Sequence, residues 1–291
     1  MTGKQNFSGT AVAVITPFHE DGRVDYSSLE KLIEKLLANG IDYLIALGTT
    51  AETPTLSKEE QIKVIETFVR VVSGRVPIIV GTGGNNTQNV IDWIAELDKY
   101  PVHGYLCVAP YYNKPNQSGL NAHFDAIATC TKRPIILYNV PGRTASNIAA
   151  ATTIRLARKH SNVVAVKEAS GSMSQIMEIV QKTPDDFAVI SGDDALTLPM
   201  IAIGAKGVIS VIAQAYPSEY SAMVRDALNG NFKAAAQRHY QLLDITNSIY
   251  KEGNPAGIKY LLNQQGVCKN HLRLPLVPIS DSLSNEIKSY M

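Results

Sequence analysis

The feature that most constrains the fold of this chain is an alternation of short apolar runs with longer amphipathic segments. Each run is continuous and rich in β-branched or small residues, which is typical of a strand buried on both faces of a sheet. Eight runs show this pattern: residues 11–16, 43–47, 76–81, 104–109, 134–138, 163–168, 187–191 and 207–210. Strands that alternate with helices predict a parallel sheet of the α/β class, and eight such units close naturally into a (β/α)8 or TIM barrel.

The segments between the runs carry helix signals. Leu29, Leu32 and Leu36 recur at helical spacing. Ser57 and Glu60 have the pattern of a capping box, which opens a helix. A doubly wound open sheet is the alternative arrangement of the same elements, but it is disfavoured because no Gly-x-Gly-x-x-Gly motif follows the first run.

The chain continues well beyond the eighth run. Helical patterns cover residues 232–250 and 255–264, and a proline-rich stretch follows at 274–278. No flexible linker precedes these segments. We therefore expect a (β/α)8 catalytic barrel at residues 1–229 and a C-terminal helical extension, residues 230–291, packed on it.

Composition argues against several classes of protein. The 27 basic and 26 acidic residues leave a net charge of +1, which offers no footprint for nucleic acid or a membrane surface. Three separated cysteines and six histidines lack the spacing of a disulfide framework or a metal site, so we expect no metal and no other cofactor. Residues 1–7 lack the apolar stretch of a signal peptide, and no later run reaches transmembrane length, which predicts a cytoplasmic protein.

One apolar run ends in a charged residue. Lys167 lies in the run at 163–168, where an ammonium must find a partner or give up its proton and act as an amine. A desolvated lysine amine is the nucleophile of Schiff-base enzymes. The alternatives are an ion pair with Glu168 and a lysine in water at the rim of the barrel.

Polar residues follow the ends of the other runs, positions that meet at one face of a (β/α)8 barrel. The segments are 48–52, 81–86, 110–115, 138–144, 191–194 and 207–210. Taken singly, these segments have structural explanations. Residues 48–50 can form a turn capped by hydroxyls, and the glycines of 81–84 allow backbones to approach closely. Tyr111 and Tyr112 can be exposed aromatic residues, and Asp193 and Asp194 can cap a helix instead of binding a cation. Taken together with Lys167, they supply phenols, a threonine hydroxyl, an arginine and an amine. That inventory fits imine chemistry on a small keto acid.

The chain resembles the dihydrodipicolinate synthase family, whose members are pyruvate-dependent class I aldolases. Signature segments carry the resemblance at residues 48–52, 110–115, 138–144, 166–169 and 191–194, and it extends into the helical tail at 252–255. The resemblance implies a lyase that condenses pyruvate with L-aspartate 4-semialdehyde. The product would be 4-hydroxy-tetrahydrodipicolinate, in the first committed step of diaminopimelate and lysine biosynthesis.

The resemblance also implies roles for four catalytic residues. Lys167 would form the Schiff base with the keto group of pyruvate, and Tyr138 would shuttle protons during imine formation and release. Thr49 and Tyr112 would complete a hydroxyl relay to solvent, in which each hydroxyl orients the next.

Substrate binding is implied in the same way. Thr50 would bind the carboxylate of pyruvate, assisted by backbone near Gly192 and Ile209. Arg143 would clamp the carboxylate of the semialdehyde, because a guanidinium offers two parallel donors. Ala51 departs from the family, which more often has glycine there, and its methyl group would be unfavourable at positive φ.

Family members usually form homotetramers, built as dimers of dimers, in which the tyrosine matching Tyr112 reaches the neighbouring subunit's site. Lysine-inhibited members bind lysine in a dimer cleft whose matching positions here include Asn85 and Tyr111. Gln61 and Asn89 stand where those members carry a histidine and a glutamate, and neither residue is charged. We therefore expect weak or absent inhibition by L-lysine.

Two alternative functions are weighed against this one. An N-acetylneuraminate lyase or a 2-keto-3-deoxy sugar-acid aldolase would share the chemistry, but the related lyases do not resemble this chain at Arg143. A non-catalytic barrel that senses a keto acid or an amino acid would not need Lys167 together with Tyr138, Thr49 and Tyr112.

Overall fold

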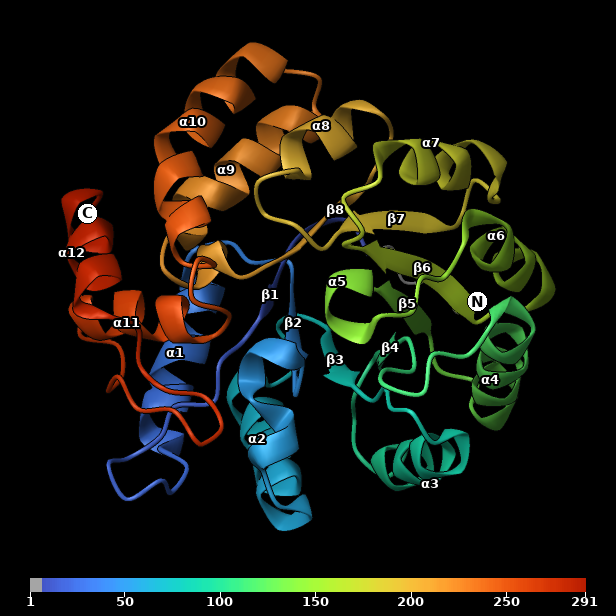
Figure 1. Ribbon diagram of the computed structural model, residues 1–291, viewed down its shortest axis with the longest axis horizontal. Helices are drawn as coiled ribbons and strands as arrows, with labels where there is room; N and C mark the ends of the chain where they lie inside the picture. The colour runs from blue at the N-terminus through green and yellow to red at the C-terminus, as the bar shows by residue number, and fades with distance from the viewer. Residues whose placement is uncertain (1–6) are drawn as a thin grey trace.

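The computed structural model describes residues 7–291, which form a closed parallel barrel surrounded by helices (Figure 1). The strands are β1 (Gly9–Ala13), β2 (Tyr43–Ala46), β3 (Ile78–Gly81), β4 (Gly104–Val108), β5 (Ile135–Asn139), β6 (Val163–Glu168), β7 (Ala188–Ser191) and β8 (Gly207–Ser210). Each strand pairs with the next along the chain, and β8 returns to β1. The predicted (β/α)8 fold is confirmed. Residues 1–6, on which the signal-peptide expectation largely rests, lie outside the described residues.

Helices connect successive strands and cover the outside of the barrel (Figure 1). They are α1 (Tyr26–Ala38), α2 (Lys58–Val72), α3 (Thr87–Leu97), α4 (Gln117–Cys130), α5 (Pro141–Thr144), α6 (Ala150–Lys159), α7 (Met173–Lys182), α8 (Thr197–Ala202) and α9 (Pro217–Leu228). Short 3-10 helices occur at η1 (Thr49–Ala51), η2 (Thr53–Thr55) and η3 (Ile212–Gln214). The predicted capping box opens α2, since Ser57 Oγ accepts from Glu60 N at 3.2 Å and Glu60 Oε2 accepts from Ser57 N at 2.9 Å.

The strand predictions agree with the structure at β6 and β8 and differ at the ends of other strands. The first strand was expected at 11–16, but it spans Gly9–Ala13, because Ile15 N donates to the side chain of Gln214 instead of a ladder partner. The third starts at Ile78 rather than at residue 76, since Pro77 has no N–H to donate to a neighbouring strand.

The strands are buried on both faces, as their continuous apolar runs predicted. Side chains of one set, including Ala11, Ile45 and Ile136, fill the inside of the barrel. The alternating set, including Val12 and Leu44, packs outward against the helices. A filled interior leaves room for a cavity only at an open end of the barrel.

Three helices follow α9: α10 (Phe232–Ser248), α11 (Ala256–Gln264) and α12 (Asp281–Ser289). Figure 1 shows α10 beside α9, and α12 lies against α10 and α11. Lys35 Nζ of α1 donates to Gln265 Oε1, just beyond α11, at 2.9 Å. The sequence analysis did not predict α12, a short helix that buries few apolar side chains, although Ser280 caps its start. Across residues 7–291 no helix combines the length and apolar character needed to span a membrane.

Gly257 is a point of close packing between the helices of the extension. A methyl group there would overlap the backbone of Ile249, just after α10. We expect Gly257→Ala to lower the free energy of unfolding by about 1–3 kcal/mol, because overpacking exceeds the gain of about 1 kcal/mol in helix propensity. Gly142→Ala is the matched control, since no heavy atom lies within 4 Å of a methyl group at that position. Denaturant unfolding of both variants measures the difference, and equal stabilities would contradict the prediction.

Candidate active site

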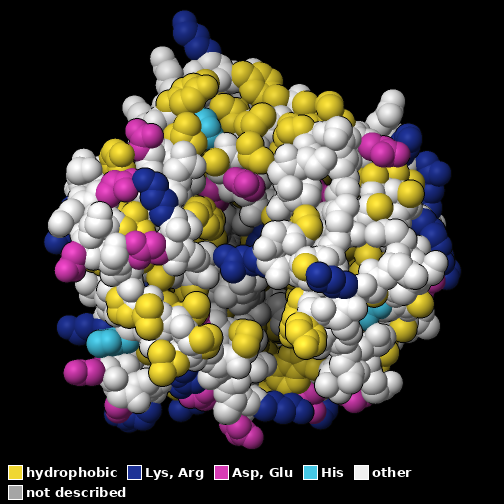
Figure 2. All heavy atoms as spheres, viewed as in Figure 1, with side chains coloured by type: hydrophobic (Ala, Val, Ile, Leu, Met, Phe, Trp, Pro, Cys, Tyr) yellow, Lys and Arg dark blue, Asp and Glu magenta, His cyan; other side chains and the backbone are white. Residues whose placement is uncertain are grey.

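A cavity of about 330 Å³ opens at the carboxyl ends of the strands, and Figure 2 shows this face hollowed near its centre. Six of the residues singled out in the sequence line it: Thr49, Thr50, Tyr138, Arg143, Lys167 and Gly192. They come from the ends of β5, β6 and β7 and from the loop after β2. The closed barrel therefore gathers residues that lie more than a hundred positions apart in the chain.

Lys167 is the buried amine of this cavity. Its side chain belongs to the inward set of β6, the residue is 6% exposed, and Nζ lies 4.3 Å from the centre of the Tyr138 ring. Within residues 7–291, no carboxylate lies within ion-pair distance of Nζ (salt bridges are formed by other lysines). A lysine that is buried, lacks an anionic partner and faces a cavity has the environment of an amine nucleophile.

The alternative partner of Lys167, Glu168, points the other way. Its carboxylate accepts hydrogen bonds from Asn139 Nδ2 at 3.1 Å, from Gln175 Nε2 at 3.0 Å and from Ser170 N at 2.9 Å. Successive side chains of a strand face opposite sides of the sheet, so Glu168 packs between the barrel and its helices. The suggested ion pair between Lys167 and Glu168 is therefore wrong.

The absence of a side chain at Gly192 leaves room for the side chain of Lys167. A methyl group at Gly192 would lie 3.0 Å from both Cγ and Cε of Lys167 and 2.8 Å from Cβ of Ala169. Gly192 N also donates to the carbonyl oxygen of Glu168 at 2.8 Å, which holds the end of β7 against β6. A larger residue here would displace the reactive side chain or the strand end.

Thr49 and Thr50 lie in η1, at the wall of the cavity. Thr50 is buried, and its Oγ1 accepts a hydrogen bond from Asn254 Nδ2 at 2.9 Å. Because Thr50 accepts from the amide, its own hydroxyl proton is free to donate into the cavity. The methyl group of Ala51 fits here, since the residues of this loop with positive φ are Leu47 and Glu52, not Ala51.

Arg143 projects from the short helix α5 and is exposed at the cavity. No carboxylate pairs with its guanidinium in the described part of the chain. It is therefore available to an anionic ligand entering from solvent.

Four of the expected residues lie outside the cavity lining. Tyr112 is 88% exposed, with φ +72°, so its hydroxyl does not join this chain's own site. Ile209 is buried in the barrel interior. Asn85 and Tyr111 lie in neighbouring loops after β3 and β4, where Asn85 Nδ2 donates to the Tyr111 carbonyl at 3.2 Å.

The C-terminal extension contributes residues that the sequence analysis missed, namely Asn247, Tyr250 and Asn254. The Tyr250 hydroxyl donates to Asp194 Oδ2 at 2.8 Å, and the same carboxylate accepts from Val211 N at 3.0 Å. Burial, and then the nearby Asp194 charge, raise the pKa of Tyr250 well above its usual value, so its proton stays on this hydrogen bond. The only sequence signal was the family-like segment at 252–255, which identified the region but not the contacts.

The acidic pair at the end of β7 is structural. Asp193 Oδ1 accepts from the backbone N–H groups of Ala195 and Leu196, while Asp194 holds the turn after β8. Across the described residues, no cluster of three or more histidine, cysteine or acidic side chains could hold a metal ion. Neither aspartate caps α8, whose N-cap residue Leu196 receives no side-chain hydrogen bond, so the expected helix cap is wrong. Both carboxylates instead accept hydrogen bonds from backbone N–H groups of turns.

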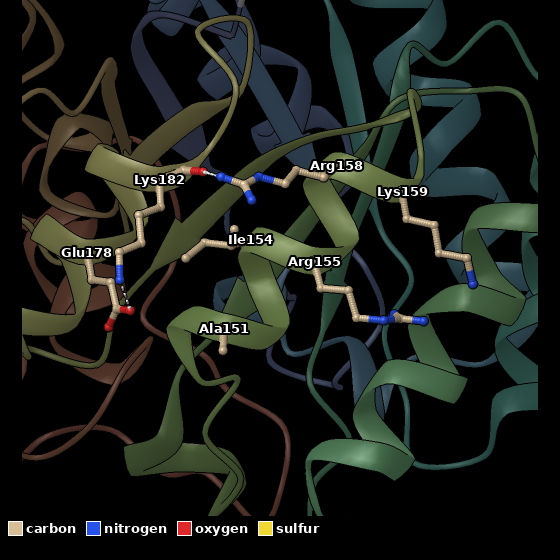
Figure 3. Close-up of a pocket in the computed structure, with 7 residues that line it drawn as sticks. All are labelled: Ala151, Ile154, Arg155, Arg158, Lys159, Glu178 and Lys182. Carbon is tan, nitrogen blue, oxygen red and sulfur yellow. Dashed lines mark hydrogen bonds and ion pairs between the residues drawn. The ribbon is translucent and has the colours of Figure 1, made fainter.

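A second hollow lies on the outside of the barrel between α6 and α7 (Figure 3). Its volume is about 560 Å³ and its cations are already engaged: Lys182 pairs with Glu178 at 2.8 Å, and Arg155 pairs with Asp125 at 2.8 Å. Arg158 donates to the Lys182 carbonyl at 2.7 Å. The hollow is open to solvent and holds no buried reactive group, so the barrel cavity is the candidate active site.

Comparisons with known proteins show the family to which this chain is related. The sequence profile of the Dihydrodipicolinate synthetase family matches residues 6–291. A 4-hydroxy-tetrahydrodipicolinate synthase of Parabacteroides distasonis is 50% identical over 273 residues, covering 94% of this chain and 92% of the relative. The crystal structure of a dihydrodipicolinate synthase from Aquifex aeolicus superposes with a TM-score of 0.95 at 44% identity, covering 97% of this chain and 96% of that one. A structure of the Cyanidioschyzon merolae enzyme with lysine bound has a TM-score of 0.96 at 38% identity, covering 99% and 98%.

Proposed function

This chain belongs to the dihydrodipicolinate synthetase family, and we propose that it condenses pyruvate with L-aspartate 4-semialdehyde to give 4-hydroxy-tetrahydrodipicolinate. Relatives of closely similar length and high identity are named for this activity. The observation that carries the proposal is the buried Lys167 amine, which faces a cavity with no carboxylate beside it. The enzyme is a lyase of the class I aldolase type, and its product feeds diaminopimelate and lysine biosynthesis.

The covalent step takes place at Lys167. Its amine nitrogen attacks the keto carbon of pyruvate, a C–N bond forms, and the keto oxygen leaves as water after two protons are transferred to it. Loss of a proton from the pyruvate methyl group then gives an enamine, whose carbon attacks the aldehyde carbon of the second substrate. Attack of that substrate's amino group on the imine carbon closes the ring and releases the Lys167 amine.

The proton transfers of these steps are assigned to Tyr138, Thr49 and Tyr112. The Tyr138 ring lies against the Lys167 amine, and Thr49 lines the same cavity. Hydroxyls in a chain can pass protons while holding one another in orientation. Tyr112 is exposed in this chain, which supports a role in the site of a neighbouring subunit and, with it, assembly as a homotetramer of two dimers.

We assign the carboxylates of the two substrates to binding groups on different sides of the cavity. Thr50 has a free hydroxyl proton for the carboxylate of pyruvate, and backbone near Gly192 and Ile209 completes that pocket. Arg143, at the solvent side, binds the carboxylate of the semialdehyde.

Trapping with borohydride tests the proposed function. Reduction of the chain in the presence of pyruvate is expected to add a pyruvyl-derived mass to the peptide that contains Lys167, because only an imine is fixed in this way. Peptide mass mapping locates the adduct. Lys167→Ala abolishes it, whereas Lys182→Ala, on the outer hollow of Figure 3, retains it. An adduct on another lysine, or none, would overturn the assignment.

Arg143→Ala separates the two substrates. Loss of a charge-assisted contact to the semialdehyde carboxylate should cost about 2–3 kcal/mol of transition-state binding, while trapping of pyruvate at Lys167 is retained. Steady-state kinetics with each substrate varied in turn measures the effect. Arg155→Ala, on the outside of the barrel, is the control. Equal loss of trapping and turnover would mean that Arg143 organises the whole site.

Regulation by L-lysine is predicted to be weak or absent. In the region of the family's lysine cleft, Gln61 Nε2 donates to the Leu56 carbonyl at 3.1 Å, and Asn89 has no charge to pair a ligand amine. Lys58 adds a cation, held 5.4 Å from the centre of the Trp93 ring. A cationic ligand therefore lacks a counter-charge among these residues.

Turnover measured across L-lysine concentrations decides this prediction, and clear inhibition below the millimolar range would contradict it. The double variant Gln61→His/Asn89→Glu restores the residue types of lysine-inhibited members. It is expected to become more sensitive to L-lysine, since a glutamate can pair the ligand's amine.

A further inference from the structure

Two oppositely charged side chains are completely buried beneath the cavity wall and take no part in the proposed chemistry. Glu52 Oε1 and Lys259 Nζ lie 2.5 Å apart, and both side chains have zero exposure. Glu52 ends the loop that carries Thr49 and Thr50, whereas Lys259 belongs to α11 of the C-terminal extension. The pair therefore joins the active-site loop to a segment more than two hundred residues away in sequence.

The surroundings hold each charge from several sides. Glu52 Oε2 accepts from Arg273 N at 3.0 Å, and Lys259 Nζ donates to the His271 carbonyl at 2.9 Å. The lysine also stacks 4.0 Å from the centre of the Phe18 ring. Burial is the main cause of a lowered pKa at Lys259, and the Glu52 charge opposes that shift. Each charged group of the pair is therefore held by further contacts inside the protein, unlike an ion pair at the surface.

Stability alone does not account for such a pair. Desolvation of two charges often cancels their attraction, and well-packed apolar residues of similar volume commonly serve at least as well. Buried ion pairs are better attested as devices that fix one arrangement of the chain. Here the arrangement includes a non-glycine residue, Glu52, in the left-handed conformation at φ +53°.

The same C-terminal segment touches the loop at a second point. Asn254, five residues before Lys259, donates to Thr50 Oγ1 at 2.9 Å, and Thr50 lies two residues before Glu52. Two contacts therefore define both the position of the Thr50 hydroxyl and the path of the loop around it. On the proposed function, this hydroxyl meets the carboxylate of pyruvate.

We propose that Glu52 and Lys259 are positioning residues, whose ion pair fixes the Thr49–Thr50 hydroxyls for pyruvate through the C-terminal extension. The inference rests on the proposed function, because the readout is pyruvate binding at Lys167. A purely structural pair would change the folded fraction and the unfolding midpoint. A positioning pair changes the half-saturating pyruvate concentration of the folded enzyme.

The test compares three variants: Glu52→Gln, Lys259→Met and Glu52→Gln/Lys259→Met. Each is measured for thermal unfolding, for steady-state KM and kcat, and for the pyruvate concentration that gives half-maximal borohydride trapping. The single variants are expected to raise that concentration about 10- to 100-fold, the scale of a small misplacement of binding groups. Lys259→Met also lowers the unfolding midpoint because it leaves Glu52 buried and unpaired.

The double variant distinguishes an effect on the position of the threonine hydroxyls from an effect on the stability of the fold. With both charges removed, its unfolding midpoint should return toward that of the unaltered chain, while half-saturation stays raised because the anchor is gone. Asp226→Asn is the matched control: it breaks the 2.9 Å ion pair between Asp226 of α9 and Arg238 of α10 and touches neither threonine. This variant should leave half-saturation unchanged.

Three results would overturn the proposal: unchanged half-saturation in Glu52→Gln, recovery of half-saturation along with stability in the double variant, or an equal shift in Asp226→Asn. Failure of the proposed function looks different, since the unaltered chain would then form no pyruvate adduct at all.

Discussion

Closure of eight parallel strands into a ring is the constraint on which the rest of the structure depends. Once β8 pairs with β1, no strand has a free edge and the interior is filled by side chains such as Ala11 and Ile136. Reactive groups can then lie only where the strands end. This geometry explains why a lysine at the end of one strand faces a tyrosine at the end of its neighbour.

The alternation of side chains across a strand separates two charges that are adjacent in sequence. Lys167 points into the cavity without an anionic neighbour, whereas Glu168 is satisfied by amides and a backbone N–H outside the barrel. The two-residue period of the strand therefore leaves the Lys167 amine in the cavity without a carboxylate partner, as the proposed imine formation requires.

The C-terminal extension completes the site that the barrel begins. Tyr250 supports the turn after β8 through Asp194, and Asn254 orients Thr50. The buried pair of Glu52 and Lys259 ties the same loop to α11. The extension thus forms a wall of the barrel cavity as well as a cover for the barrel.

Short windows of sequence predicted the eight strands and the barrel and singled out Lys167 as a candidate, because burial on both faces and polar strand ends leave local patterns. The resemblance of short segments to a known family singled out Thr50 and Arg143 as candidates. Which residues meet in space follows from the fold instead. Asn254 reaches Thr50 across 204 positions, and Glu52 reaches Lys259 across a similar span, contacts that no local pattern encodes. Such contacts arise when chain closure brings distant segments together, so their energies depend on a geometry that exists only in the folded protein.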